Sequence, residues 1–205
     1  MLRAYPIDKI SIASSVRSKY LVYLRFLNLL LTLFPRGILN IFIEKNEMEV
    51  CVKKSYISEF LNFLKDHTWA QFKVLSDIIA IDYPGRADRF EVIYQLLSIR
   101  YNSRVNISVV TDELVGVQTS CEVYKGSAWY EREVWDLFGI FFEKHPDLRR
   151  ILTDYSFEGH PLRKDFPVSG YFEVFYSDAK KRIVYEPVSL VQEYRYFTFA
   201  NPWLT

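Results

Sequence analysis

Hydrophobic and polar positions follow two periods along this chain, and together they predict a sheet with helices packed against it. Apolar residues at every second position predict strands at 38–52 (a hairpin), 72–82, 90–100 and 105–111. Apolar residues spaced three and four apart predict helices at 17–34, 56–66 and 127–138. The 90–100 run is apolar on both faces, which predicts a central strand.

The fold class that follows is α+β: a small mixed or antiparallel sheet with helices on one side, then a long irregular charged loop and an extended C-terminal tail. The expected divisions are an N-terminal helix or extension (1–37), an α+β core (38–128), a helix with the charged loop (129–173), and a last hairpin with the tail (174–205). The tail from Val188 is aromatic and too short for its own core. It either drapes over a neighbour or packs back on its own domain.

Local signals set the expected ends of the helices. Ser55 and Ser127 precede apolar periodic runs and are predicted to cap the second and third helices. Gly139 is expected to stop the third helix. Arg132 and Asp136 are four residues apart on that helix and are expected to pair.

Bulk properties exclude several classes of protein. The chain has 205 residues, a formal net charge of +1 and two cysteines, Cys51 and Cys121. The charge disfavours nucleic-acid binding, and two separated cysteines hold neither an iron–sulfur cluster nor a structural zinc by themselves. The apolar run at 20–34 is too short to span a membrane. The basic flank before it fits a transit peptide or a native N-terminus, and both interpretations stay open.

The charged loop carries the candidate chemistry. His145 and Asp147 form an H-x-D pair, and with His160 they are one alternative: a free-standing non-haem iron enzyme. The chain has no GxSxG, HExxH or nucleotide-binding glycine motif. The remaining interpretation is a binding surface, because arginines, acids and aromatic residues alternate there as they do in specific protein interfaces.

The segment from 129 to 174 reads WYEREVWDLFGIFFEKHPDLRRILTDYSFEGHPLRKDFPVSGYFEV. It resembles the signature of the 30 kDa subunit family of respiratory complex I, whose mitochondrial members are called NADH dehydrogenase subunit 9 and which has bacterial members too. The likeness extends over roughly residues 38–203, including FKVLSDIIAIDYPGRADRFEVIYQLLS and EPVSLVQEYRYFTFANPW. Ser156 stands where the family usually has Gly, and Phe175 stands where Arg is common.

The resemblance implies a non-catalytic core subunit of the hydrophilic arm, supporting electron transfer from NADH to ubiquinone through structural and assembly contacts. It implies no cofactor in this chain, with FMN, iron–sulfur clusters and ubiquinone in partner subunits. The expected partners are other peripheral-arm subunits, above all the large quinone-site subunit, and neither nucleic acid nor a membrane span. The expected place is the matrix side of the mitochondrial inner membrane, or the cytoplasmic face of a bacterial membrane.

The expected signature and interface residues lie on the third helix and the loop after it. They are Glu131, Arg132, Glu133, Asp136, His145, Asp147, Arg149, Arg150, Asp154, Glu158, His160, Arg163, Lys164 and Asp165. Arg132 and Asp136 are expected to hold the helix. The basic residues of the loop are expected to pair with acids locally or on partners.

Overall fold

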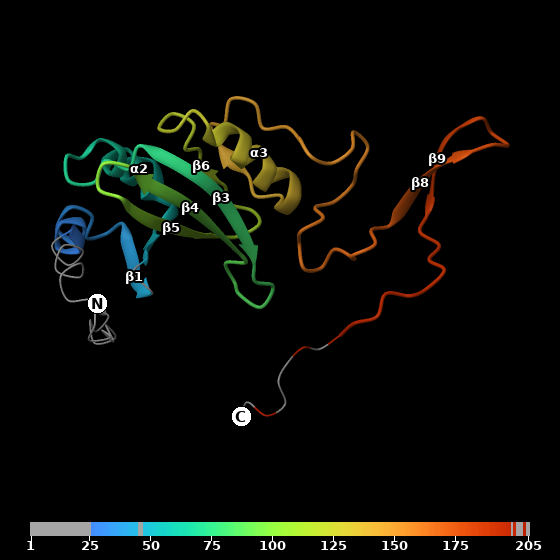
Figure 1. Cartoon of the computed structure of the whole chain (residues 1–205), viewed down its shortest axis with the longest axis horizontal. Coiled ribbons are helices and arrows are strands. Elements are labelled where there is room, and N and C mark those ends of the chain that lie inside the picture. The colour runs from blue at the N-terminus through green and yellow to red at the C-terminus, as the bar shows by residue number, and fades with distance from the viewer. Residues whose placement is uncertain (1–25, 45–46, 198, 200–202, 204–205) are drawn as a thin grey trace.

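The computed structural model describes residues 26–44, 47–197, 199 and 203. A five-stranded sheet forms its centre, and helices α2 and α3 lie on one face of that sheet (Figure 1). The sheet contains β1 (Ile38–Glu44), β2 (Glu47–Val52), β3 (Val74–Asp82), β4 (Phe90–Ser98) and β5 (Ser103–Thr111). The other elements are η1 (Lys54–Tyr56), α2 (Ile57–Asp66), β6 (Val117–Gln118), α3 (Ser127–Phe138), β7 (Phe142–Glu143), β8 (Phe172–Ser177) and β9 (Arg182–Pro187). The predicted α+β class is confirmed.

The sheet is mixed, with strand order β1-β2-β5-β4-β3. The pairs β1–β2, β3–β4 and β4–β5 are antiparallel, as expected for chain segments joined by short turns. The pair β2–β5 is parallel, and its long connection runs through α2, β3 and β4. β4 is an internal strand, but β5 occupies the centre of the sheet.

The core lies between the helices and one face of the sheet. Val50, Ile107, Tyr94 and Ile78 are aligned across four neighbouring strands and are all buried. Phe60 of α2 is also fully buried in this cluster. The predicted alternation is therefore real, because one face of each strand meets the helices and the other does not.

Both predicted serine caps are wrong. α2 starts after the 3-10 turn η1, and its N-cap residue Tyr56 makes no side-chain capping bond. The N-cap of α3 is Gly126, and the Ser127 hydroxyl instead donates to the carbonyl of Tyr124 at 2.7 Å. The predicted stop at Gly139 is confirmed: its φ is +76°, the left-handed conformation that glycine adopts without strain.

The chain before the sheet is helical over residues 26–33, where Leu27 and Leu30 are buried, and the helix ends before Pro35 as predicted. The earlier part of the predicted helix and the transit-peptide question lie outside the described residues. Within the described part of the chain, no helix is long and apolar enough to cross a bilayer.

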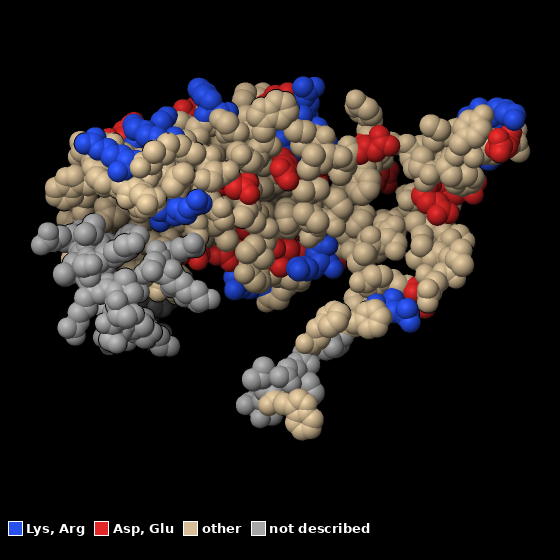
Figure 2. Space-filling view, in the orientation of Figure 1, with Lys and Arg blue, Asp and Glu red and all other residues tan. Residues whose placement is uncertain are grey.

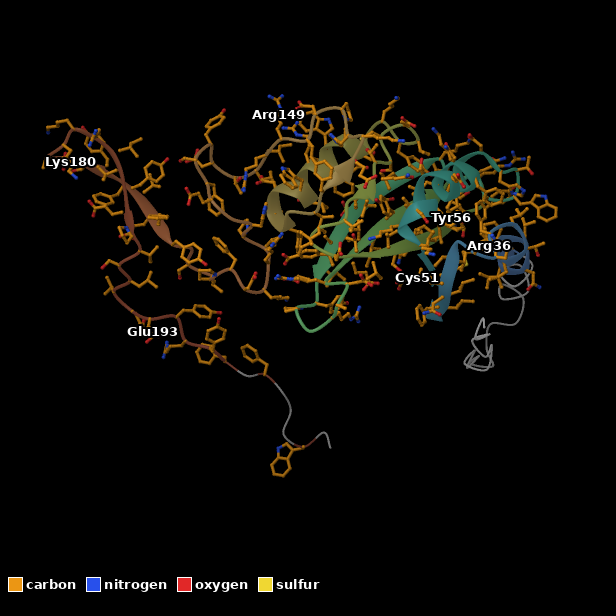
Figure 3. All side chains as sticks on the ribbon, turned by 180° about the vertical axis from the view of Figure 1, so that it is seen from behind. Arg36, Cys51, Tyr56, Arg149, Lys180 and Glu193 are labelled. Carbon is orange, nitrogen blue, oxygen red and sulfur yellow. The ribbon has the colours of Figure 1, made fainter. Side chains whose placement is uncertain are left out.

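After β7 the chain runs through turns and bends until the β8–β9 hairpin. We call residues 144–171 the charged loop and residues 172–197 the C-terminal arm. The charged loop passes along α3, whereas the arm extends away from the folded domain (Figure 1). Figure 3 shows Lys180 and Glu193 on this arm, well separated from Cys51 and Tyr56 in the domain. The sequence pattern also predicts strands at 171–176 and 182–186 for the last hairpin, and the ends of β8 and β9 agree with these to within one residue.

Candidate functional site: the charged loop around α3 and the C-terminal arm

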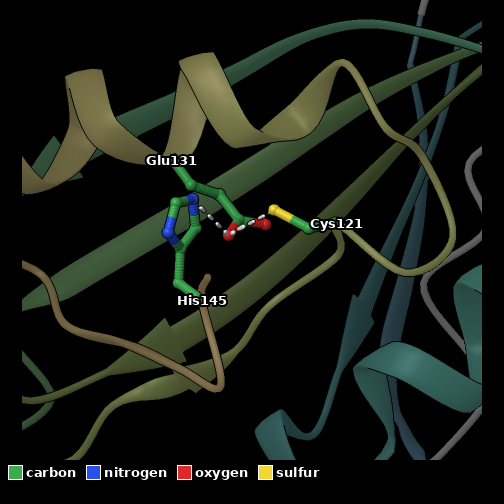
Figure 4. Close-up of side chains that lie close together, drawn as sticks. All are labelled: Cys121, Glu131 and His145. Carbon is green, nitrogen blue, oxygen red and sulfur yellow. Dashed lines mark hydrogen bonds and ion pairs between the residues drawn. The ribbon is translucent and has the colours of Figure 1, made fainter. Parts of the chain in front are cut away.

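Glu131 projects from α3 into a fully buried polar cluster (Figure 4). Its carboxylate accepts hydrogen bonds from the Thr119 hydroxyl at 2.5 Å, and from the Ser120 backbone N–H and hydroxyl at 2.7 and 2.6 Å. The Cys121 thiol lies 3.5 Å away. These bonds fasten residues 119–121 beneath the helix, so Glu131 is satisfied inside its own domain.

Cys121, Glu131 and His145 present three potential metal-ligating atoms within 4.8 Å of one another. The hydrogen bonds around His145 argue against a metal there. Its Nδ1 accepts the Asp147 backbone N–H at 3.1 Å, so Nε2 carries the ring proton and faces the carbonyl of Ala128 at 3.3 Å. A metal on Nε2 would need the opposite tautomer. Burial also raises the pKa of the Cys121 thiol, which disfavours the thiolate that metals bind.

The iron-site alternative from the sequence is wrong. His145 lies beside Ala128 at the start of α3, whereas His160 lies beside the carbonyl of Asp136 near its end. Eight helical residues separate those contacts by about 12 Å. The Asp147 carboxylate pairs with Arg149 at 3.0 Å on the surface. The three proposed ligands do not converge, because the loop runs along the helix and does not fold back on itself.

Asp136 anchors the charged loop. Its fully buried carboxylate accepts the backbone N–H groups of Ile151, Leu152 and Thr153, at 3.2, 2.8 and 2.9 Å. It also accepts the Thr153 hydroxyl at 2.6 Å and the Arg150 guanidinium at 3.2 Å. Burial alone would raise the pKa of Asp136, but the hydrogen bonds from Thr153 and its neighbours outweigh it and lower that pKa.

The predicted Arg132–Asp136 pair is wrong. Arg132 donates to the carbonyls of Arg149 and Arg150, at 3.1 and 3.3 Å. Arg150 in turn donates to the carbonyl of Gly159 at 2.9 Å. The helix therefore holds the loop with charged side chains aimed at loop backbone.

The end of α3 is covered by the second half of the loop. Arg163 donates to the carbonyl of Phe138 at 2.6 Å, and the His160 ring lies 2.9 Å from the carbonyl of Asp136. Burial, followed by nearby guanidinium charge, lowers the pKa of His160 and favours the neutral ring. Because Nδ1 faces a carbonyl oxygen, Nδ1 carries the ring proton and donates it. These groups occupy the space above Gly139, where an added Cβ would lie 2.5 Å from the His160 ring.

A second anchor, which sequence reasoning missed, joins the loop to the sheet. Arg89 pairs in bidentate fashion with buried Asp82, at 2.6 and 2.8 Å, across the turn between β3 and β4. The same guanidinium reaches Asp165 at 3.0 Å and Glu113 at 2.5 Å. Hydrogen bonds from Arg89 and from the Lys164 backbone N–H lower the pKa of Asp82. The available signal was an acid at the end of one predicted strand and an arginine just before the next, at the two ends of the connection between them.

The other predicted residues lie on the outside of the loop and helix. Glu133, Glu158 and the Lys164 side chain are exposed, and the Asp154 carboxylate accepts the Tyr155 backbone N–H at 2.8 Å. The same surface carries exposed apolar side chains, among them Leu152 and Tyr155. The predicted interface role of this surface stays a prediction.

The C-terminal arm of the described chain is rich in exposed apolar side chains. Its exposed large side chains are Phe172, Val174, Phe175, Tyr176, Ile183, Tyr185, Leu190, Val191, Tyr194, Tyr196 and Phe197. The described tail residues run clear of the domain, so the packing-back alternative is not what the structure shows (Figure 1). Exposed apolar surface of this extent marks an interaction site.

Comparison with known proteins places these features in a family. The family model described as "Respiratory-chain NADH dehydrogenase, 30 Kd subunit" matches residues 50–172. NADH-ubiquinone oxidoreductase subunit 9 of Prototheca wickerhamii is 56% identical over 159 residues, covering 78% of this chain and 83% of the relative. NADH dehydrogenase [ubiquinone] iron-sulfur protein 3 of Solanum tuberosum is 56% identical over 148 residues, covering 72% of this chain and 78% of the relative.

A solved structure shares the fold. A chain from the membrane-bound sulfane sulfur reductase, an archaeal respiratory membrane complex, superposes with a TM-score of 0.60 at 24% identity. The likeness covers 71% of this chain and 85% of that chain. At this identity the comparison supports the arrangement of strands and helices alone.

Proposed function

Because this chain belongs to the family of the 30 kDa subunit of respiratory-chain NADH dehydrogenase, we propose that it serves complex I as a structural subunit without a redox centre of its own. The enzyme activity is NADH–ubiquinone oxidoreduction by the whole assembly. The proposed contribution of this chain is to hold subunits of the hydrophilic arm together around the quinone module.

The state of the signature residues supports this role. Glu131, Asp136 and Arg163 are each engaged in hydrogen bonds that fold the charged loop onto α3. A catalytic group has to present a free, positioned atom to a substrate. These side chains instead present their atoms to the chain's own backbone and hydroxyl groups, which makes a rigid surface.

The cysteines support the proposal that iron–sulfur clusters belong to partners. The name of the Solanum tuberosum relative includes "iron-sulfur protein", but clusters are held by four thiolates or by thiolates with histidines. Here Cys51 faces the side of the sheet away from the helices, while Cys121 lies under α3. Burial raises the pKa of both thiols. The proposed locations of FMN, the clusters and ubiquinone are therefore neighbouring subunits.

The single observation that carries the proposal is the C-terminal arm. Its apolar side chains project from a two-stranded hairpin and an extended tail with no core beneath them. Such a segment becomes stable when a partner covers it. The proposed partner is the large subunit of the quinone site, and the proposed place is the matrix face of the mitochondrial inner membrane, or the cytoplasmic face in a bacterium.

Native gel electrophoresis of solubilised membranes tests the proposal. The full chain should co-migrate with the large band that reduces dye with NADH, and a chain ending at Gly170 should be lost from that band. The variant Glu59→Gln, an exposed change on α2 away from the loop and the arm, is the control and should assemble normally. Normal assembly without the arm, or stoichiometric iron or flavin in the purified chain, would refute the structural role.

A further inference from the structure

The β8–β9 hairpin of the C-terminal arm has two unlike faces. The register pairs Phe172 with Pro187, Val174 with Tyr185 and Tyr176 with Ile183, so all six side chains project from the same face. The five large ones other than Pro187 are between 51% and 64% exposed. This face is apolar from one end of the hairpin to the other.

An isolated two-stranded hairpin is marginally stable in water, and it needs a surface against its apolar face. Within the described chain, the contact with the charged loop is polar. The Tyr185 hydroxyl lies 3.2 Å from the Ser156 hydroxyl and 3.5 Å from the Asp154 carboxylate. The apolar face itself stays open, so it is available to a partner.

The opposite face carries a charge arrangement that disfavours the free hairpin. Glu173 and Glu186 are directly opposite each other across the two strands. Like charges in that position destabilise a sheet. The next pair on this face, Phe175 with Val184, is apolar, and Arg182 is one pair further away. The ion pairs of the described residues involve neither glutamate.

The tip of the hairpin has the opposite charge. Lys180 and Lys181 lie in the turn, Arg182 begins β9, and the Asp178 carboxylate lies 4.0 Å from the Lys181 ammonium group. Figure 2 shows blue side chains at this tip and red side chains toward the base. The hairpin is therefore polarised along its length, with acids at the base and bases at the tip.

We propose that the hairpin is a docking element that selects its partner by charge. The occupant is a subunit that offers an apolar strip to the Phe172–Tyr185 face. At the base of the hairpin the partner also reaches around to the opposite face, where it supplies a basic side chain that binds between Glu173 and Glu186. Arginine suits this position, because its planar fork can donate to two carboxylates at once. This inference rests on the proposed structural role and adds the partner's chemistry. The repulsion in the free chain becomes attraction in the complex, so the glutamate pair selects the correct partner.

The test uses the full chain with the double change Glu173→Gln and Glu186→Gln. Hydrogen exchange of the free chain should show hairpin amides protected as well as, or better than, in the unchanged chain, because a repulsion is removed. In the assembled enzyme, salt stripping followed by native electrophoresis should show roughly tenfold weaker retention, the loss of about one charge-assisted contact. If the two glutamates only supported the fold of the hairpin, the double change would not raise protection in the free chain while weakening retention in the assembled enzyme.

Two further variants complete the test. Glu59→Gln makes the same chemical change at an exposed position of α2, outside the loop and the arm, and should leave retention unchanged. The double change Val174→Thr and Ile183→Thr keeps β-branched shape but removes apolar surface, and it should also weaken retention. Retention of the glutamine double variant equal to that of Glu59→Gln would overturn the charge pairing. Full retention of the threonine variant would overturn the docking role of the apolar face. Failure of the unchanged chain to co-migrate at all would instead refute the proposed function.

Discussion

The substitution Asp136→Asn tests whether one carboxylate organises the charged loop. The buried carboxylate receives three backbone N–H groups, one hydroxyl and the Arg150 guanidinium. Asparagine keeps the shape but replaces one acceptor oxygen with a donor. The remaining oxygen can serve the three backbone groups, but the new amide N–H₂ then faces Arg150 and the Thr153 hydroxyl.

The magnitude follows from those contacts. Thr153 can reverse its hydroxyl, so that bond is largely kept. The Arg150 contact is lost, and a hydrogen bond to a charged group contributes about 1.5–3 kcal/mol. The backbone bonds to Asp136 also weaken when the acceptor becomes neutral. Because Arg150 is partly exposed, water replaces part of its lost hydrogen bonding. We therefore expect the free energy of opening the loop to fall by about 3 kcal/mol in all.

Native-state hydrogen exchange is the assay, because the cost is local to the loop. Opening that is easier by about 3 kcal/mol corresponds to roughly a hundredfold loss of protection at Ile151, Leu152 and Thr153. Amides of β4 should change little. Asp154→Asn, an exposed neighbour, is the matched control. Unchanged protection of the three loop amides in Asp136→Asn would show that the anchor has been assigned to the wrong residue.

Three other outcomes follow from the same anchors. The folded-state pKa values of Asp82 and Asp136 are lowered, so their contribution to stability is present above the unfolded value of about 4 and is lost as pH falls through the folded values. The urea concentration at the unfolding midpoint should therefore decrease when the pH is lowered below about 4, and it should decrease less in the chain that carries both Asp82→Asn and Asp136→Asn. Arg89→Ala leaves a buried carboxylate without its partner and should cost about 3–5 kcal/mol by urea unfolding, with Arg89→Lys recovering only part. Gly139→Ala combines a left-handed backbone with a Cβ placed 2.5 Å from an imidazole, and should lower stability by about 2 kcal/mol or more, whereas Gly85→Ala, with open space around it, should be within about 0.5 kcal/mol.

Much of the fold could be predicted from short-range pattern. The alternation in β1–β2, β4 and β5 reflects a sheet with one face against helices, and that periodicity is written directly in the sequence. The stop at Gly139 was equally local. The cap at Ser127 failed because a hydroxyl near a helix start has several acceptors within reach, and Ser127 bonds to the turn before it. The cap at Ser55 failed because Ser55 lies inside the 3-10 turn that precedes α2.

The site was harder to predict because its contacts are long-range. The spacing of Arg132 and Asp136 suggested a pair, but the backbone of the loop offered better-placed partners to both side chains. Glu131 was expected among the interface residues, whereas the orientation of α3 directs it into the buried cluster with Thr119. The bond between Asp82 and Arg89 required knowing that β3 and β4 are neighbours.

The sequence by itself determined the α+β class, the family and the place of the last hairpin, because these depend on periodicity and on a dense motif. Tertiary structure alone decided that Glu131, Asp136 and Arg163 of the signature segment are turned into the domain, and that the apolar residues of the arm are turned outward. Both outcomes depend on which backbone groups lie within hydrogen-bond reach after folding. The spacing of residues along the chain does not show which of these groups come within hydrogen-bond reach.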